Sequence, residues 1–422
     1  MVHEVITKVS ARLEASESEM VEALVGLVGV PAVGPDNGGL GEFSKGLRLL
    51  ELVRGWSFDR VVRYDVPDPR AEGGVRPNIL AYYYGTDPEA SRLWILTHLD
   101  VVPPGDLSQW TITHPFKPAV VKDRVYGRGT EDNGQSIVAS LYAVKALMDL
   151  DIRPKRTVIL AFVSDEETGS KYGLRWLLDR HPDLFMRNDM ALVPDAGKSD
   201  GSFIEVAEKS ILRFKVVVRG RQTHGSMPHL GLNAHRVLNE YVREADDLLH
   251  NLYAYKNELY DPPTSTFEPT VLECKATAPN IIPGECLASI DCRILPEYSV
   301  DDVLEFVKGL ATRISEKHRR VIDGDVLPKI AIEVINKEES PPPTPLDSEV
   351  VTLLRRAVKT LRGIEVRVGG IGGGTVARFL RKAGIHAVVW STVDETAHQP
   401  NEYAVIRNIV EDAKVMAMMM LT

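Results

Sequence analysis

The stretch RLWILTHLD, residues 92–100, is apolar almost throughout and ends on a histidine and an aspartate. Unbroken apolar character, in place of alternation, is typical of a strand buried on both faces in a sheet with helices on each side. Three further stretches have this form: RTVILAFVSDEE (156–167), MALVPDAG (190–197) and IHAVVWSTVDETAH (385–398). We therefore expect four buried strands.

Helical stretches separate these strands along the chain. They are GQSIVASLYAVKALMDL (134–150), YGLRWLLDR (172–180) and DSEVVTLLRRAVKTLRG (347–363). Strands that alternate with helices indicate an α/β fold. The sequence thus predicts a mostly parallel sheet with helices on both faces.

The middle of the chain has a different pattern. ILRFKVVVRGRQ (211–222), CLASIDCRILP (286–296) and KIAIEVINKEE (329–339) alternate apolar with polar residues, as half-solvated strands do. Two helical stretches, 232–259 and 300–318, lie between them, and the proline-rich segment 338–349 follows. We expect an inserted α+β lid or dimerisation domain with an open antiparallel sheet at residues 211–340, between two parts of a catalytic domain at 1–210 and 341–422.

Composition excludes several classes of function. The 422 residues carry a formal charge of −9 with acids and bases interspersed, which argues against nucleic-acid binding and against a basic membrane patch. No apolar run is long enough to span a bilayer and the N-terminus does not have the pattern of a secretory signal, so we expect a cytoplasmic protein. The cysteines, Cys274, Cys286 and Cys292, are too few for a disulfide framework, and we expect three reduced thiols.

Polar side chains gather where the predicted strands end. Ligands bind outside the carboxyl ends of the strands in open α/β sheets. Any one of these residues alone also fits an ordinary loop position, but carboxylates and imidazoles that meet at one edge suit zinc, manganese or cobalt. The residues at these ends, together with one from the loop GRGTEDN (127–133), are His98, Asp100, Asp132, Glu166, Glu167, Asp195 and His398.

Charge accounting favours two metal ions. Three coordinating acids, Asp132, Glu167 and Asp195, would face four positive charges and leave room for one bridging hydroxide, which is available near neutral pH. Because successive side chains on extended backbone point apart, one of Glu166 and Glu167 can bind metal while the other moves the proton. Asp100 lies two residues after His98, a spacing that suits an acid that steadies a ligand imidazole.

Nine motifs in order resemble the M20 family of co-catalytic zinc aminoacyl hydrolases, which includes dipeptidases, aminopeptidases and deacylases. They are HLDVVP, GRGTEDNGQ, SDEETGS, PDAG, THGSMP, PNIIPGE, DCRILP, GGGT and AHQPNE. The resemblance covers nearly the whole chain.

The resemblance implies a role for each residue of the predicted metal site. His98 and Asp195 would hold one metal, Glu167 and His398 the other, and Asp132 would bridge both. Glu166 would be the general acid/base and Asp100 the supporting acid. The peptide bond after the bridging aspartate is cis in the family, which implies a cis bond between Asp132 and Asn133.

The resemblance also implies which residues bind the substrate. His224 would reach from one subunit of a homodimer, joined through the inserted domain, into the neighbouring site to stabilise the oxyanion. Asn280 and Arg293 would hold the substrate carboxylate. The loop GIGGGT (370–375) precedes a helix, and Gly373, Gly374 and Thr375 could hold the same carboxylate through backbone N–H groups.

The expected activity is metal-dependent hydrolysis of the amide bond of a short peptide. Asp195 stands where the family's deacylases typically have glutamate, and GGGTVAR lacks the aspartate that deacylases often show after the threonine. Both features resemble the dipeptidases. A deacylase of N-succinyl-diaminopimelate or N-acetylornithine is the alternative, and a non-catalytic dimeric binding protein is the alternative of another class.

Overall fold

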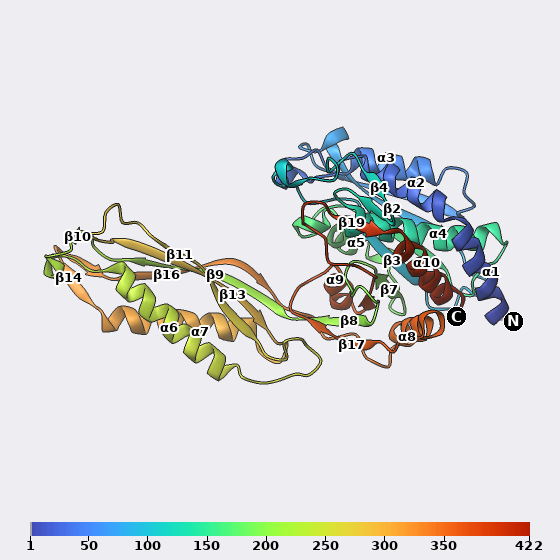
Figure 1. Cartoon of the computed structure of the whole chain (residues 1–422). Coiled ribbons are helices and arrows are strands. Elements are labelled where there is room, and N and C mark those ends of the chain that lie inside the picture. Colours follow the sequence, from blue (N-terminus) through green and yellow to red (C-terminus); the bar gives the residue numbers. More distant parts are fainter. Residues whose placement is uncertain (1) are drawn as a thin grey trace. The chain divides into compact units, whose positions relative to one another are not determined.

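The computed structural model describes residues 2–422, and the chain forms two compact units (Figure 1). The first unit runs from the N-terminal part of the chain to Val206 and resumes over Pro343–Val368 and Thr375–Thr422. The second unit comprises Ala207–Pro342 and Gly369–Gly374, so a short glycine-rich segment belongs to it as well.

An eight-stranded sheet forms the centre of the first unit. Its strands, in spatial order, are β1 (Arg60–Pro67), β2 (Val75–Tyr83), β6 (Val158–Val163), β3 (Leu93–His98), β7 (Met190–Val193), β18 (His386–Val389), β8 (Phe203–Glu208) and β17 (Arg367–Ile371). A smaller sheet contains β19 (Tyr403–Val405), β5 (Arg124–Tyr126) and β4 (Ala119–Val121).

The α/β fold class expected from the sequence is confirmed. The four predicted strands are the central ones: β3 pairs in parallel with β6 and β7, and β18 pairs in parallel with β7. The large sheet is mixed, because β1 and β2 are antiparallel to each other, β2 is antiparallel to β6, and β8 is antiparallel to β18. Parallel order brings the carboxyl ends of the four central strands to one edge.

Helices cover both faces of this sheet. On one face, α5 and α9 share an apolar cluster with Trp94 and Leu96 of β3. On the other, α10 packs against α4 and α8, and α4 and α8 contact the central strands. No helix within residues 2–422 is long and apolar enough to cross a membrane. The helices of this unit are α1 (Val2–Ala15), α2 (Glu17–Val28), α3 (Phe43–Leu52), α4 (Gln135–Asp149), α5 (Leu174–Arg180), α8 (Glu349–Arg362), α9 (Ala377–Lys382) and α10 (Ile406–Leu421).

The second unit is a four-stranded antiparallel sheet with two helices along one face (Figure 1). Its strands, in spatial order, are β11 (Thr266–Cys274), β13 (Glu285–Ile294), β9 (Ser210–Arg219) and β16 (Lys329–Glu338), and its helices are α6 (Ala234–Leu252) and α7 (Val300–Lys317). Every second residue of β13 is buried against the helices, which explains the alternating pattern in the sequence. Two short pairs, β10 (Thr223–His224) with β12 (Ile281–Ile282) and β14 (Arg320–Ile322) with β15 (Asp325–Leu327), complete the unit.

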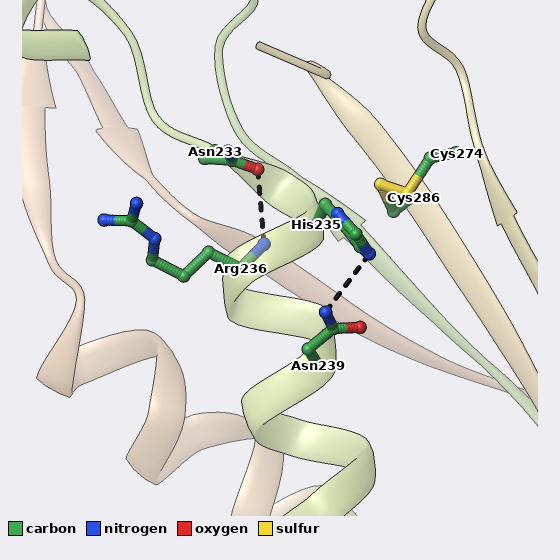
Figure 2. The surroundings of a disulfide bond; sticks show 6 residues. All are labelled: Asn233, His235, Arg236, Asn239, Cys274 and Cys286. Carbon is green, nitrogen blue, oxygen red and sulfur yellow. Dashed lines mark hydrogen bonds between the residues drawn. A yellow bond between two sulfur atoms is a disulfide. The ribbon is translucent and has the colours of Figure 1, made fainter. Parts of the chain in front are cut away.

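The expectation of three reduced thiols is wrong for two of the cysteines. Cys274 and Cys286 form a disulfide, whereas Cys292 is a buried free thiol. The antiparallel register of β11 and β13 places Cys274 directly opposite Cys286, a neighbour relation that their spacing in the sequence does not reveal. Figure 2 shows this disulfide near the start of α6, where Asn233 caps the helix and the His235 ring lies 3.1 Å from the Asn239 amide.

Candidate metal centre and active site

The side chains expected at the metal site come from the carboxyl ends of the central strands. β3 ends at His98, and Asp100 follows it. β6 runs into a short 3-10 turn, Glu166–Thr168, and β7 is followed by Asp195. The loop after β18 carries His398. Parallel pairing therefore explains why residues from four separate stretches share one edge.

Asp132 lies between the two histidines. One carboxylate oxygen, Oδ1, is 2.8 Å from Nε2 of His98, and the other, Oδ2, is 2.9 Å from Nε2 of His398. This residue precedes α4, and the peptide bond between Asp132 and Asn133 is cis, as the resemblance implies. An aspartate with one oxygen facing each histidine has the arrangement needed to bridge two cations.

Each histidine also contacts an acid of its own. His98 Nε2 lies 3.3 Å from Asp195, and His398 Nε2 lies 3.2 Å from Glu167. Ligand atoms within 4.8 Å of one another form two groups, His98 with Asp132 and Glu167, and His98 with Glu166 and Asp195. The structure thus brings together all five residues expected to bind metal, with Glu166 beside them.

Asp100 holds the turn that carries both glutamates. Its two carboxylate oxygens accept the backbone N–H groups of Glu166 and Glu167, each at 3.0 Å. Nδ1 of His98 lies 3.0 Å from the backbone carbonyl of Asp100 and 3.5 Å from its carboxylate. Asp100 therefore orients the imidazole chiefly through its carbonyl, while its carboxylate positions the turn.

The ionisable groups of this cluster shift one another's pKa values. Burial and the charge of Asp195 raise the pKa of Glu166 well above its ordinary value. Burial and the charge of Asp132 raise the pKa of Glu167 to about 8. Hydrogen bonds to Asp132 and Glu167 raise the pKa of His398 to about 10. Crowded acids of this kind are stabilised by cations, and the donor set of imidazole and carboxylate fits zinc, cobalt or manganese.

Three buried residues around the site were not expected from the sequence. Asn133 donates to the Pro194 carbonyl and to the carboxylate of Asp195, both at 2.9 Å. Glu131 and Glu402 are buried carboxylates next to ligand residues. Asn133, Glu131 and Glu402 all stand inside the motifs GRGTEDNGQ and AHQPNE, so motif membership was the available signal.

Further charged residues are buried next to the site. Lys45 is buried, and burial lowers its pKa to about 8 although Asp100 and Glu402 act to raise it. The fully buried guanidinium of Arg76 pairs with both oxygens of Glu42, which also accepts the backbone N–H of Asp165 at 3.2 Å. Nothing in the local sequence around these residues distinguishes them from surface charges.

The residues expected to bind substrate lie mostly in the second unit. Its His224 is exposed, with Nδ1 2.8 Å from the Ser226 hydroxyl and Nε2 3.4 Å from the amide of Asn280. β10 and β12 hold this pair together, because His224 is opposite Ile281. The structure therefore places His224 and Asn280 side by side.

Arg293 lies near the glycine loop. Its guanidinium pairs with Asp291 at 2.6 Å and donates to the carbonyl of Gly372 at 2.9 Å, the residue just before Gly373 and Gly374. Thr375 belongs to the first unit, where its hydroxyl accepts the backbone N–H of Ala377 at the start of α9. Among the histidines without an expected role, His114, His229 and His235 are exposed.

Comparisons with known proteins agree with the fold and identify the family. The sequence profile of peptidase family M20/M25/M40 matches residues 94–422. An uncharacterized metallohydrolase of Methanocaldococcus jannaschii is 39% identical over 398 residues, which cover 92% of this chain and 95% of that protein. The succinyl-diaminopimelate desuccinylase of Alkalilimnicola ehrlichii is 28% identical over 308 residues, with coverage of 72% and 77%.

A solved structure shows the same fold. The di-peptidase Dug1p of Saccharomyces cerevisiae superposes with a TM-score of 0.72 at 16% identity and covers 100% of this chain and 98% of its own. The chain belongs to peptidase family M20, as its motifs indicated, and is a metallohydrolase that acts on amide bonds.

Proposed function

We propose that this protein hydrolyses the amide bond of short peptides with two divalent metal ions per subunit. His98 and Asp195 would hold one ion, Glu167 and His398 the other, and Asp132 both. The observation that carries the proposal is the position of Asp132, whose two oxygens face the two histidines. Zinc is the ion we propose, with cobalt and manganese as alternatives for a site rich in oxygen ligands.

The residues around the metal ligands have complementary roles. When bound, two such ions polarise the scissile carbonyl and acidify water at neutral pH. Glu166 takes the proton of the attacking water and passes it to the leaving amine, for which a carboxyl with a raised pKa is suited. Asp100 keeps Glu166 in place through the backbone of the turn.

The residues expected to bind substrate stabilise the other charges of the peptide. His224 stabilises the oxyanion that develops on the scissile carbonyl. The carboxylate of the substrate is held by Arg293 and Asn280. The backbone N–H groups of Gly373, Gly374 and Thr375 hold it as well. Asp291 keeps the guanidinium of Arg293 oriented.

A deacylase of N-acyl amino acids is the second candidate. The desuccinylase relative, at 28% identity, favours it. Asp195 and the GGGTVAR loop favour peptides. A hydrolysis screen of dipeptides, N-acetyl amino acids and N-succinyl diamino acids, each with zinc, cobalt and manganese, separates the two. We expect dipeptides to be cleaved fastest, and cleavage of succinylated diamino acids alone would replace the proposal with the second candidate.

We also propose a homodimer joined through the second unit. β11 is an edge strand that exposes Val271 (41%) and Leu272 (57%), and a groove separates it from Asn239 and Val242 of α6. An open edge with apolar side chains is suited to pairing with a second copy.

Mixed dimers test whether His224 acts across that interface. Glu166→Gln and His224→Ala are each expected to be inactive. If His224 serves the neighbouring site, a mixed dimer of the two variants contains one site with both residues intact. Random mixing should then restore about one quarter of wild-type activity, because half of the dimers are mixed and each has one intact site. No recovery in verified mixed dimers means that His224 acts within its own subunit, and full activity of His224→Ala alone means that it does not act at all.

A further inference from the structure

Two loops of the first unit carry ligand residues and lie against each other. Residues 127–135 carry Asp132, and residues 394–402 carry His398. Each loop also holds a buried glutamate, Glu131 in the first and Glu402 in the second, which are 4% and 0% exposed. Nearly all hydrogen-bond partners of each glutamate lie on the opposite loop.

Glu402 receives four donors from the loop that carries Asp132. One oxygen accepts the Arg128 guanidinium at 2.6 Å and the Gly129 N–H at 3.0 Å. The other accepts the N–H of Glu131 at 3.0 Å and that of Asp132 itself at 3.1 Å. The backbone of the bridging aspartate is thus bound directly by a residue from the His398 loop.

Glu131 makes the reverse connection. One oxygen accepts the Asp394 N–H at 2.7 Å. The other accepts the N–H and hydroxyl of Thr396 and the N–H of Ala397, the last at 2.7 Å. Ala397 immediately precedes His398, so this carboxylate fixes the backbone at the second histidine.

We propose that Glu131 and Glu402 are positioning residues that form a reciprocal clamp between the two loops and so set the spacing of Asp132 and His398. The inference rests on the metal ligands proposed above. Hydrogen bonds to a buried carboxylate are strong, and losing an acceptor leaves buried donors unpaired. A shift of either loop must break several of these bonds, so the clamp maintains the 2.9 Å approach of Asp132 to His398.

The clamp predicts that its two members affect the metal sites differently. Glu131 fixes the backbone beside His398, which would hold one ion, whereas Glu402 fixes Asp132, which would contact both. Glutamine keeps one acceptor oxygen and turns an NH₂ group toward donors that lose their partner. Glu131→Gln should therefore weaken the binding of one ion, and Glu402→Gln should weaken the binding of both.

Calorimetric titration of the metal-free protein with zinc tests this without measuring activity. His398→Ala identifies the binding step that depends on His398. In Glu131→Gln we expect that step to weaken about 10- to 100-fold while the other changes little, and in Glu402→Gln we expect both to weaken. Asp189→Asn is the matched control. Asp189 directly precedes β7, at the opposite end of that strand from the proposed metal ligands, and its buried carboxylate accepts hydrogen bonds from Arg92, Trp94 and Met186. It should lower stability and leave both steps unchanged.

Unchanged binding steps in Glu131→Gln, with a loss of stability similar to that of Asp189→Asn, would overturn the clamp. If Glu131→Gln does not fold, Thr396→Val decides, because it keeps the carboxylate and removes the hydroxyl, which lies 2.9 Å from Glu131 and also bonds the backbone of Tyr403. A smaller shift of the His398-dependent step supports the clamp, and no shift overturns it. If the wild-type chain takes up no zinc, both the proposed function and the clamp are refuted. If the wild type takes up zinc normally and the variants bind it equally well, only the clamp is refuted.

Discussion

Replacement of Glu166 by glutamine removes the proposed general base and little else. Gln has the same shape as Glu, and the backbone at this position is held by Asp100 through a 3.0 Å hydrogen bond that the substitution does not touch. The five proposed metal ligands remain. The variant therefore isolates the proton-transfer step.

The size of the effect follows from that role. A positioned general acid/base contributes about 10² to 10⁴ in rate, which is about 3 to 5 kcal/mol of barrier. Because an amide cannot take the proton of water at any pH, the loss should fall on kcat and leave KM nearly unchanged. Burial and the charge of Asp195 raise the pKa of the Glu166 carboxyl well above its usual range, which suits a group that both takes and gives a proton.

The measurement is steady-state hydrolysis of the best dipeptide, with metal content determined on the same samples. The matched control is Glu349→Gln, on α8, whose carboxylate bonds Ser91 and Arg156 and should leave kcat unchanged. If Glu166→Gln retains both ions and turns over within about tenfold of wild type, the assignment of the base is refuted.

Three further results are expected. Arg293→Lys should raise KM about 10- to 100-fold for substrates with a free carboxylate, because the guanidinium fork is lost, and should not affect substrates amidated at that group. Burial lowers the pKa of Lys45 to about 8 from 10.5, so folding disfavours its charged form. The contribution of Lys45 to the free energy of unfolding of the metal-free protein should therefore rise between about pH 8 and 10.5, by on the order of 3 kcal/mol. The raised pKa of His398 acts in the opposite direction over part of this range, so the measurement is the difference between the denaturation curves of the wild type and of Lys45→Met. Thiol titration of the denatured, non-reduced protein should find one thiol, Cys292, and three after reduction of the Cys274–Cys286 bond, while burial, which raises the pKa of Cys292, should protect it from alkylation in the native state.

Continuous apolar stretches predicted the central strands well. β3, β6, β7 and β18 are buried on both faces, and this double burial is what removes alternation from their sequences. β1 has exposed and half-buried positions and pairs antiparallel at the edge of the sheet, so its sequence had no comparable signal. The mixed character of the sheet therefore came only from the structure.

The ligand residues were predictable for a related reason. Parallel strands end at one edge, so polar residues after four apolar stretches were expected to meet there. His98 and Asp195 are separated by 3.3 Å in the structure, as that argument requires. The role of the Asp100 carboxylate was only partly foreseen, because its main partners are the backbone N–H groups of a turn.

What the chain's local sequence determines is therefore the type of each strand and the chemistry at its end, since both depend on neighbours along the backbone. What the tertiary structure decides is pairing between distant segments. Glu402 accepts the N–H of Asp132 from 270 residues away, and Cys274 meets Cys286 only through the register of two strands. Such contacts depend on how the loops and sheets close in space, and a hydrogen bond or disulfide forms only where that closure brings its two partners within reach.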